Sequence, residues 1–146
     1  MDVSHIGVRV RDLDASVKFY TALGFTEAKR LTVPDQMAEG LLGLSPPIGF
    51  EAVYLRNGGV VLQLLTFSGY PAPDEPERGM VGAGLTHLSV AVADLAAAQD
   101  AVTAAGGAVV ADPGGGFACM VRDPDGQLIE LVNERVRPVP PVNEAR

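Results

Sequence analysis

The chain repeats part of its own sequence. The twenty residues from His5 to Gly24 align without a gap with those from His87 to Gly106, and nine of the aligned pairs are identical. A chain of 146 residues with such a repeat is expected to fold as two copies of one structural unit, within a domain of ordinary size.

Each copy of the repeat begins with apolar residues at alternate positions, which is typical of a half-buried strand. An aspartate follows in both copies, Asp12 and Asp94, and its carboxylate is suited to cap the first N–H groups of a helix. Gly24 and Gly106 stand where a helix commonly ends in a residue of positive φ. Each copy therefore predicts a strand, a helix and a stop.

Both halves continue with a turn that precedes another strand. Asn57-Gly58 is typical of a two-residue hairpin turn, and Asp123-Pro124-Asp125-Gly126 of a type I turn. The sequence thus predicts an α+β fold of two tandem βαβββ modules. The expected strands are about 5–11, 26–32, 49–56, 60–67, 86–92, 107–110, 117–122 and 128–132, with helices near 13–22 and 95–105.

The two modules are expected to form one domain, residues 1–134. Module one covers about 3–67 and module two about 85–134, and an exposed connector rich in proline, glycine and acidic residues lies between them at 68–84. Residues 135–146 include three prolines and are expected to form an extended tail.

Composition excludes several classes of function. The net charge of −7, without a cluster of Lys and Arg, leaves no electrostatic footprint for DNA or RNA. No apolar run approaches roughly 18 residues and no secretory signal opens the chain, so we expect a cytoplasmic protein without a membrane segment. Cys119 is the only cysteine, and the chain has no third histidine to deprotonate it, so a nucleophilic role lacks its base and we expect a small buried apolar side chain.

Four polar residues interrupt the apolar pattern at equivalent places. The first strand of each module carries a histidine, His5 or His87, on the face opposite its apolar residues. In the last strand, Gln63 or Glu130 stands between apolar neighbours. A histidine at the start of a strand is usually structural or exposed, but these are the only two in the chain and share one repeat position. A pseudo-twofold packing would bring the four side chains together, and two imidazoles, an amide oxygen and a carboxylate suit one divalent transition metal.

These features resemble the vicinal oxygen chelate superfamily, the glyoxalase/bleomycin-resistance/dioxygenase group. Four segments carry the resemblance from His5 to Val132: HIGVRVRDLDASVKFYTALGF, VLQLL, GLTHLSVAVADL and VRDPDGQLIELV. Members build a U-shaped, open-barrel sheet from two βαβββ modules and hold a metal with one residue from each first and last strand. The resemblance implies a single divalent ion, Ni, Co, Mn, Zn or Fe, with four ligands: His5, Gln63, His87 and Glu130.

The ligand set is most similar to that of methylmalonyl-CoA epimerases, whereas glyoxalase I commonly has glutamate where Gln63 stands. The segment SPPIGFEA departs from the epimerases, because it lacks the catalytic glutamate that they carry ahead of a Gly-Val step.

The resemblance implies an enzyme whose metal binds vicinal oxygens of a small substrate and stabilises an enolate or a similar oxyanion. An isomerase or lyase that works by proton abstraction is the simplest interpretation. Two alternatives stay open. One is an extradiol-type Fe(II) dioxygenase using His5, His87 and Glu130, although such enzymes generally use another histidine near the metal. The other is a metal-free protein that binds a small molecule such as an antibiotic. Small members of the group usually pair, so we also expect a homodimer.

Glu130 and two further residues are candidates for the chemistry. Glu130 is a candidate general base as well as a ligand, and Glu51 is the other candidate base. An Asn57-Gly58 turn would pair Ala52 with Gln63 and turn Glu51 away from the cavity, whereas a shift of one residue would turn it inward. Arg9 follows His5 on the same strand face, so it is either a donor to a substrate anion or an exposed arginine at the sheet rim. Residues 32–49 are expected to form a short packed helix or a cover over an apolar ligand.

Overall fold

The computed structural model describes residues 2–74 and 79–139. The chain divides into two units, Met1–Glu75 and Pro76–Arg146. The division falls inside the predicted connector, of which residues 75–78 lie outside the described part, as do residues 140–146 of the predicted tail.

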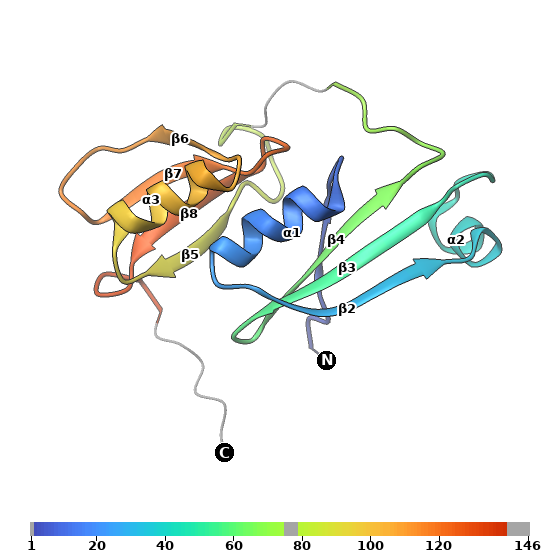
Figure 1. The fold of residues 1–146 in the computed structure, drawn as a ribbon, viewed down its shortest axis with the longest axis horizontal. Coiled ribbons are helices and arrows are strands. Elements are labelled where there is room, and N and C mark those ends of the chain that lie inside the picture. The colour runs from blue at the N-terminus through green and yellow to red at the C-terminus, as the bar shows by residue number, and fades with distance from the viewer. Residues whose placement is uncertain (1, 75–78, 140–146) are drawn as a thin grey trace, which may run out of the picture. The chain divides into compact units, whose positions relative to one another are not determined.

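The first unit is a four-stranded sheet with two helices. Its elements in chain order are β1 (Ile6–Arg9), α1 (Leu13–Ala22), β2 (Thr26–Val33), α2 (Asp35–Leu42), β3 (Phe50–Asn57) and β4 (Val60–Phe67). The strand order is β1-β4-β3-β2, and β1 runs parallel to β4 while the other neighbours are antiparallel. Helix α1 follows β1 in the long connection that this parallel pairing requires, and it lies on one face of the sheet (Figure 1).

The second unit has the same topology. It consists of β5 (Leu88–Val92), α3 (Leu95–Ala104), β6 (Ala108–Ala111), β7 (Ala118–Arg122) and β8 (Leu128–Asn133). The order β5-β8-β7-β6, with β5 parallel to β8, repeats that of the first unit. Two βαβββ units are therefore confirmed.

The predicted helix ends are present in both units. The Asp12 carboxylate accepts a hydrogen bond from the N–H of Ala15 at 2.9 Å, and that of Asp94 accepts one from the N–H of Ala97 at 3.0 Å. Gly24 and Gly106 follow the two helices with φ of 87° and 91°. The aspartate cap and the terminal glycine, which both copies of the repeat contain, thus begin and end the helix in the same way in each unit.

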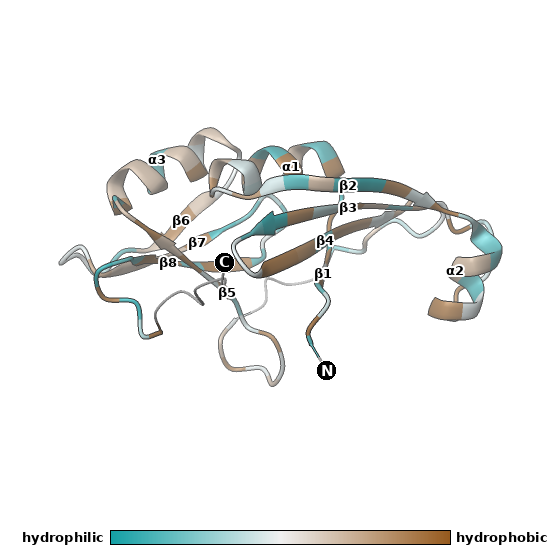
Figure 2. Ribbon diagram, turned by 90° about the horizontal axis from the view of Figure 1, so that it is seen from below, coloured by the Kyte–Doolittle hydropathy of each residue, from teal (hydrophilic) through white to brown (hydrophobic). Residues whose placement is uncertain are grey.

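The two faces of the first sheet differ in character. Leu62 and Leu64 of β4 are fully buried on the face that α1 covers, together with Phe19 and Tyr20 of the helix. Figure 2 shows hydrophobic residues along β4 and hydrophilic ones in β2. The residues that alternate with Leu62 and Leu64, including Gln63, point to the face away from α1.

Helix α2 and the loop after it close one end of that other face. Ala38 and Ile48 are fully buried against Phe50 and Ala52. The Asp35 carboxylate accepts hydrogen bonds from the N–H groups of Ile48 and Gly49, both at 3.0 Å, and these bonds hold the pKa of Asp35 below its ordinary value. The short packed helix predicted within residues 32–49 is confirmed.

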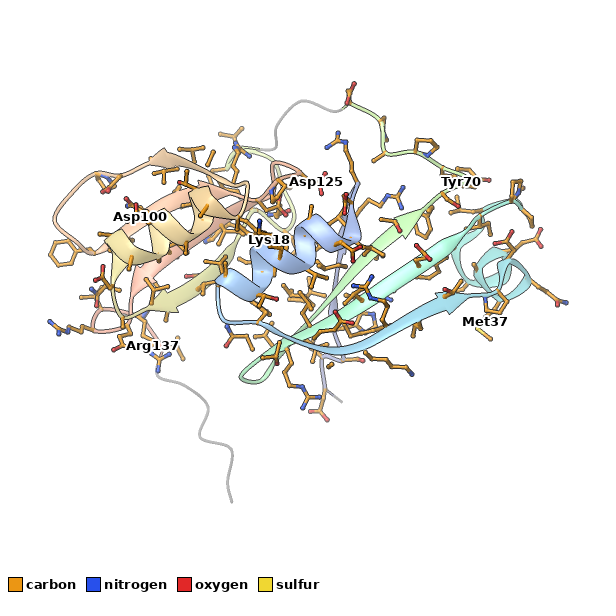
Figure 3. All side chains as sticks on the ribbon, viewed as in Figure 1. Lys18, Met37, Tyr70, Asp100, Asp125 and Arg137 are labelled. Carbon is orange, nitrogen blue, oxygen red and sulfur yellow. The ribbon has the colours of Figure 1, made fainter. Side chains whose placement is uncertain are left out.

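The loop after α2 is also held by the chain that follows β4. Tyr70 lies in this following chain (Figure 3). Its hydroxyl donates to the carbonyl of Ser45 at 2.7 Å and accepts from the N–H of Ser45 at 2.9 Å. The N–H of Gly69 donates to the carbonyl of Ile48 at 3.0 Å. A Cβ added at Gly69 would overlap the Pro47 carbonyl, so this close approach requires glycine.

The β3–β4 hairpin register matches neither of the two alternatives left open by the sequence, because it is shifted by two residues from the register of an Asn57-Gly58 turn. Asn57 stays in the ladder opposite Val60, because the adjacent Gly58 and Gly59 make the turn and Gly58 has φ of 54°. Tyr54, and not Ala52, consequently lies opposite Gln63.

No helix in the described residues is long and apolar enough to cross a membrane.

We expect Gly69→Ala to lower the free energy of unfolding by about 1–3 kcal/mol, because the methyl group displaces the backbone of Pro47. Gly40→Ala is the matched control: Gly40 lies in α2 with open space around its Cβ position, and alanine there should raise helix stability by roughly 0.5–1 kcal/mol. Urea unfolding measures both variants. Equal stability of the two variants would contradict the close approach.

Candidate metal centre

The first unit brings His5 and Gln63 to one face of its sheet. Gly7 lies opposite Gln63 in the parallel β1–β4 pair, and His5, two residues before Gly7, is directed to the same side. The ladder of β1 begins at Ile6, one residue after the predicted start, so His5 immediately precedes the strand. His5 is exposed and Gln63 is half-buried.

Tyr54 of β3 contacts both of these residues. Its hydroxyl accepts a hydrogen bond from Nε2 of Gln63 at 2.8 Å. Its ring meets the His5 ring edge-on, with the centroids 5.5 Å apart and the planes at 81°. The amide nitrogen of Gln63 is therefore engaged, which leaves the oxygen Oε1 to act as a ligand.

The second unit brings His87 and Glu130 together. His87 immediately precedes β5, and Ser89 lies opposite Glu130 in the parallel β5–β8 pair. Nε2 of His87 is 3.9 Å from Oε2 of Glu130, and the Ser89 hydroxyl donates to the same oxygen at 2.6 Å. His87 and Glu130 are both partly exposed, with 27% and 34% of their side chains accessible.

Each histidine has a hydroxyl beside its Nδ1. The Ser4 hydroxyl lies 3.1 Å from Nδ1 of His5, and the Thr86 hydroxyl lies 2.9 Å from Nδ1 of His87. An outer-shell partner on one ring nitrogen fixes the orientation of the imidazole and leaves the other nitrogen to bind a metal. In both units that other nitrogen is Nε2.

The donor chemistry fits a divalent transition metal. Each unit offers one imidazole nitrogen and one side-chain oxygen, a combination typical of Ni, Co, Mn, Zn and Fe sites. Within residues 2–74 and 79–139, no three side chains of His, Cys, Asp or Glu form a metal-holding group. Each unit thus contains one pair of candidate donors.

Glu51 lies away from the pair formed by His5 and Gln63. It is opposite Thr66 on the β3–β4 ladder, three residues from Tyr54, and therefore points to the face that α1 covers. The structure realises the alternative in which Glu51 is turned away, although through a different register from the one expected. We therefore give Glu51 no part in the candidate site.

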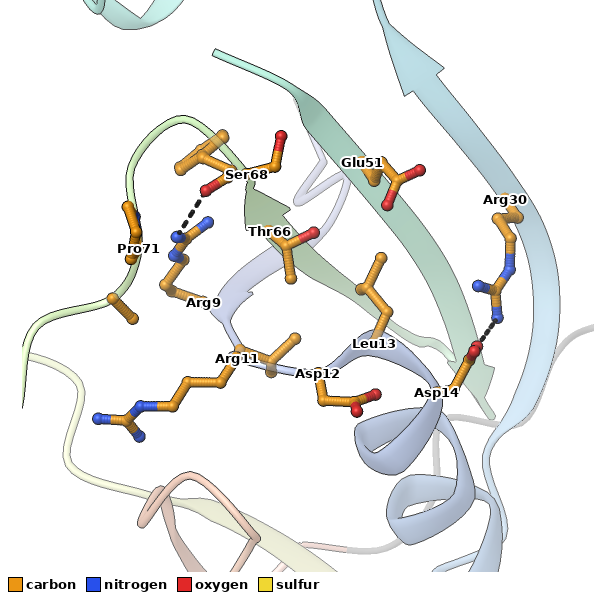
Figure 4. Close-up of a pocket in the computed structure, with 13 residues that line it drawn as sticks. Arg9, Arg11, Asp12, Leu13, Asp14, Arg30, Glu51, Thr66, Ser68 and Pro71 are labelled. Atoms are coloured by element: carbon orange, nitrogen blue, oxygen red, sulfur yellow. Dashed lines mark hydrogen bonds and ion pairs between the residues drawn. The ribbon is translucent and has the colours of Figure 1, made fainter. Parts of the chain in front are cut away.

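Arg9 lies on the same strand face as His5 and packs against the end of β4. Its guanidinium is 4.4 Å from the centre of the Phe67 ring and donates to the carbonyls of Phe67, at 3.4 Å, and Tyr70, at 2.6 Å. These contacts hold the chain after β4 against β1. Arg9 also lines a cavity of about 510 Å³ beside the start of α1, together with Leu13, Arg30 and Glu51 (Figure 4).

Cys119 of β7 is buried, with 2% of its surface exposed, and burial raises the pKa of its thiol. This confirms the prediction of a buried apolar side chain.

The sequence interpretation missed the hydroxyl groups that hold the candidate ligands. The repeat offset relates Ser4 to Thr86 and would have shown that both histidines follow a hydroxyl residue. Tyr54 carried no such signal, because it becomes a partner of Gln63 only through the observed register.

Comparison with known proteins agrees with the fold. Residues 2–131 match the model of the Glyoxalase/Bleomycin resistance protein/Dioxygenase superfamily. A probable lactoylglutathione lyase of Vibrio parahaemolyticus is 32% identical over 138 residues, which cover 91% of each chain. A probable chloroplastic lactoylglutathione lyase of Arabidopsis thaliana is 31% identical over 143 residues, or 93% of this chain. The chain spans only 37–45% of the length of the plant relatives that it matches.

Solved structures give the same result. The trypanothione-dependent glyoxalase I of Leishmania major superimposes with a TM-score of 0.68 at 27% identity, over 90% of this chain and 85% of that one. A glyoxalase family protein of Bacillus cereus superimposes with a TM-score of 0.79 at 20% identity, over 90% and 92% of the two chains, and shows the shared fold. The chain therefore belongs to the glyoxalase/bleomycin resistance protein/dioxygenase superfamily.

Proposed function

We propose that the protein is a divalent-metal-dependent lyase that acts on a small molecule with vicinal oxygens by proton abstraction. The observation that carries this proposal is the pair of candidate donors in each unit, a histidine before the first strand and Gln63 or Glu130 in the last strand. The name of the Vibrio relative, which this chain matches along nearly its whole length, supports a lyase.

In this proposal the two pairs of donors, His5 with Gln63 and His87 with Glu130, hold one ion of Ni, Co, Mn, Zn or Fe. When bound, such an ion acts as a Lewis acid on the oxygens of the substrate. The amide of Gln63 is neutral, so the set contains a single carboxylate where glyoxalase I commonly has two. A less negative donor set leaves more positive charge to stabilise a developing oxyanion.

Glu130 is the proposed general base. Its Oε2 accepts a hydrogen bond from Ser89, which fixes the carboxylate group. The other carboxylate oxygen is then held in one direction and can accept a proton from a carbon acid within hydrogen-bond reach. Arg9 is the proposed donor to an anionic group of the substrate, because it lies on the strand face that carries His5 and its guanidinium offers several N–H donors.

We propose that the first reaction to test is the formation of lactoylglutathione, or of a thioester of the same kind. Its formation from the glutathione adduct of a 2-oxoaldehyde moves a proton between two carbons that both carry oxygen, which is the chemistry that one base beside a Lewis acid can perform.

The two-histidine, one-carboxylate set also matches Fe(II) dioxygenases. Oxygen consumption in place of thioester formation would favour that second function.

We expect the reconstituted protein to bind one divalent ion per chain. His87→Ala removes a proposed ligand and should therefore weaken the affinity for the ion. The loss should exceed the roughly 10–100-fold that removal of an outer-shell partner costs. Gln99→Ala is the control, because this amide lies on α3 and binds Asp112. Elemental analysis and calorimetric titration measure both variants. A wild-type protein without bound metal after reconstitution would favour the metal-free binding protein.

We expect Glu130→Gln to separate metal binding from proton transfer. The amide keeps an oxygen donor and the size of the side chain but has no basicity, so metal should remain bound while turnover falls by about 10²–10⁴-fold. Incorporation of solvent deuterium at the substrate carbon measures the proton step directly. Full activity in this variant would show that Glu130 is a ligand only and that the base lies elsewhere.

We also propose that the protein forms a homodimer. β2 and β6 are each at the edge of their sheet, and the exposed edge of a sheet favours pairing or coverage by another chain. Light scattering at high micromolar concentration should give twice the mass of the chain. A monomer would contradict the dimer and leave the metal proposal unaffected.

A further inference from the structure

The side-chain amide of Gln63 has two ends that differ chemically. Oε1 is an acceptor able to bind a cation, whereas Nε2 is a donor only. The two ends are nearly identical in shape, so packing alone does not select which of them faces an ion. A neighbour that recognises the nitrogen therefore strengthens the binding of a metal by a glutamine, because it holds the oxygen toward the ion.

Tyr54 is such a neighbour. The β3–β4 register places it directly opposite Gln63, and its hydroxyl oxygen accepts the Nε2 hydrogen at 2.8 Å. The oxygen of the amide then lies on the side of Gly7, where a Cβ built on the glycine would be 3.7 Å from Oε1. Glycine at this position presents no side-chain donor that would compete for the oxygen.

The second unit provides an internal comparison. Met120 occupies the place opposite Glu130 that Tyr54 occupies opposite Gln63. Glu130 receives its hydrogen bond from Ser89, the repeat equivalent of Gly7. A carboxylate has two equivalent oxygens, so either can face an ion and no neighbour needs to orient it. In the described residues, the tyrosine accompanies the amide and is absent beside the carboxylate.

We propose that Tyr54 is a positioning residue that fixes the Gln63 amide with Oε1 turned toward the metal. The edge-on contact with the His5 ring, at 5.5 Å between centroids, lets the same side chain hold the second donor of this unit. This inference rests on the proposed function, because it assigns Tyr54 to the metal site named there.

The test is the affinity for Co²⁺ or Ni²⁺ of Tyr54→Phe, measured with Gln63 and again in Gln63→Glu. Phenylalanine keeps the ring beside His5 and removes only the hydroxyl. We expect the substitution to weaken binding by about 10–100-fold with Gln63 present and by clearly less with glutamate, because a carboxylate needs no orientation. A role in general packing would weaken both to the same extent.

Tyr70→Phe is the matched control. It also removes one tyrosine hydroxyl, but one that bonds to the backbone of Ser45 in the loop after α2. We expect its metal affinity to equal that of the wild type. A loss in Tyr70→Phe as large as that in Tyr54→Phe would overturn the specific role of Tyr54.

A second readout needs no metal. In the metal-free protein the Gln63 side-chain N–H₂ signals should show slow exchange with water and a hydrogen-bonded shift by NMR, and Tyr54→Phe should abolish both. Unchanged Gln63 signals in the variant would overturn the proposal. A wild type that binds no metal overturns the proposed function together with this role. A wild type and Tyr54→Phe that bind metal equally overturn the role of Tyr54 alone.

Discussion

The parallel pairing of the first and last strands in each unit determines where the candidate ligands lie. The β1–β4 register sets Gly7 beside Gln63, and the β5–β8 register sets Ser89 beside Glu130. Since each histidine stands two residues before this contact, on the same side of its strand, the pairing assembles one imidazole and one side-chain oxygen in each unit. A slip of one residue would move Gln63 or Glu130 to the face covered by the helix.

Apolar packing on the other face maintains that register. Leu62 and Leu64, on either side of Gln63, are fully buried under α1, and Ile129 and Leu131, on either side of Glu130, are fully buried too. A slip would expose these side chains at a cost of roughly 1.5–3 kcal/mol each. The hydrophobic core therefore fixes the direction of the polar residues that alternate with it.

The repeat alone predicted most of the fold, because alternation, the Asp12 and Asp94 caps and the terminal glycines are local signals. The register of the β3–β4 hairpin, in contrast, is not determined by one local signal. Asn57-Gly58 and Gly58-Gly59 are both good turn pairs, and choosing the second moves the partner of Gln63 from Ala52 to Tyr54. Arg9 contacts Phe67 at the end of β4 and Tyr70 after it. The sequence contains no local signal that this part of the chain lies against β1, so these contacts could not be predicted.

We propose that His5, Gln63, His87 and Glu130 bind one ion together, and a crystal structure of the Co²⁺- or Ni²⁺-loaded protein would identify the ligands. We expect a single strong anomalous peak, with Nε2 of both histidines, Oε1 of Gln63 and a carboxylate oxygen of Glu130 at about 2.0–2.2 Å from the ion. An ion held by other residues, or an anomalous map without a peak at these atoms, would contradict it.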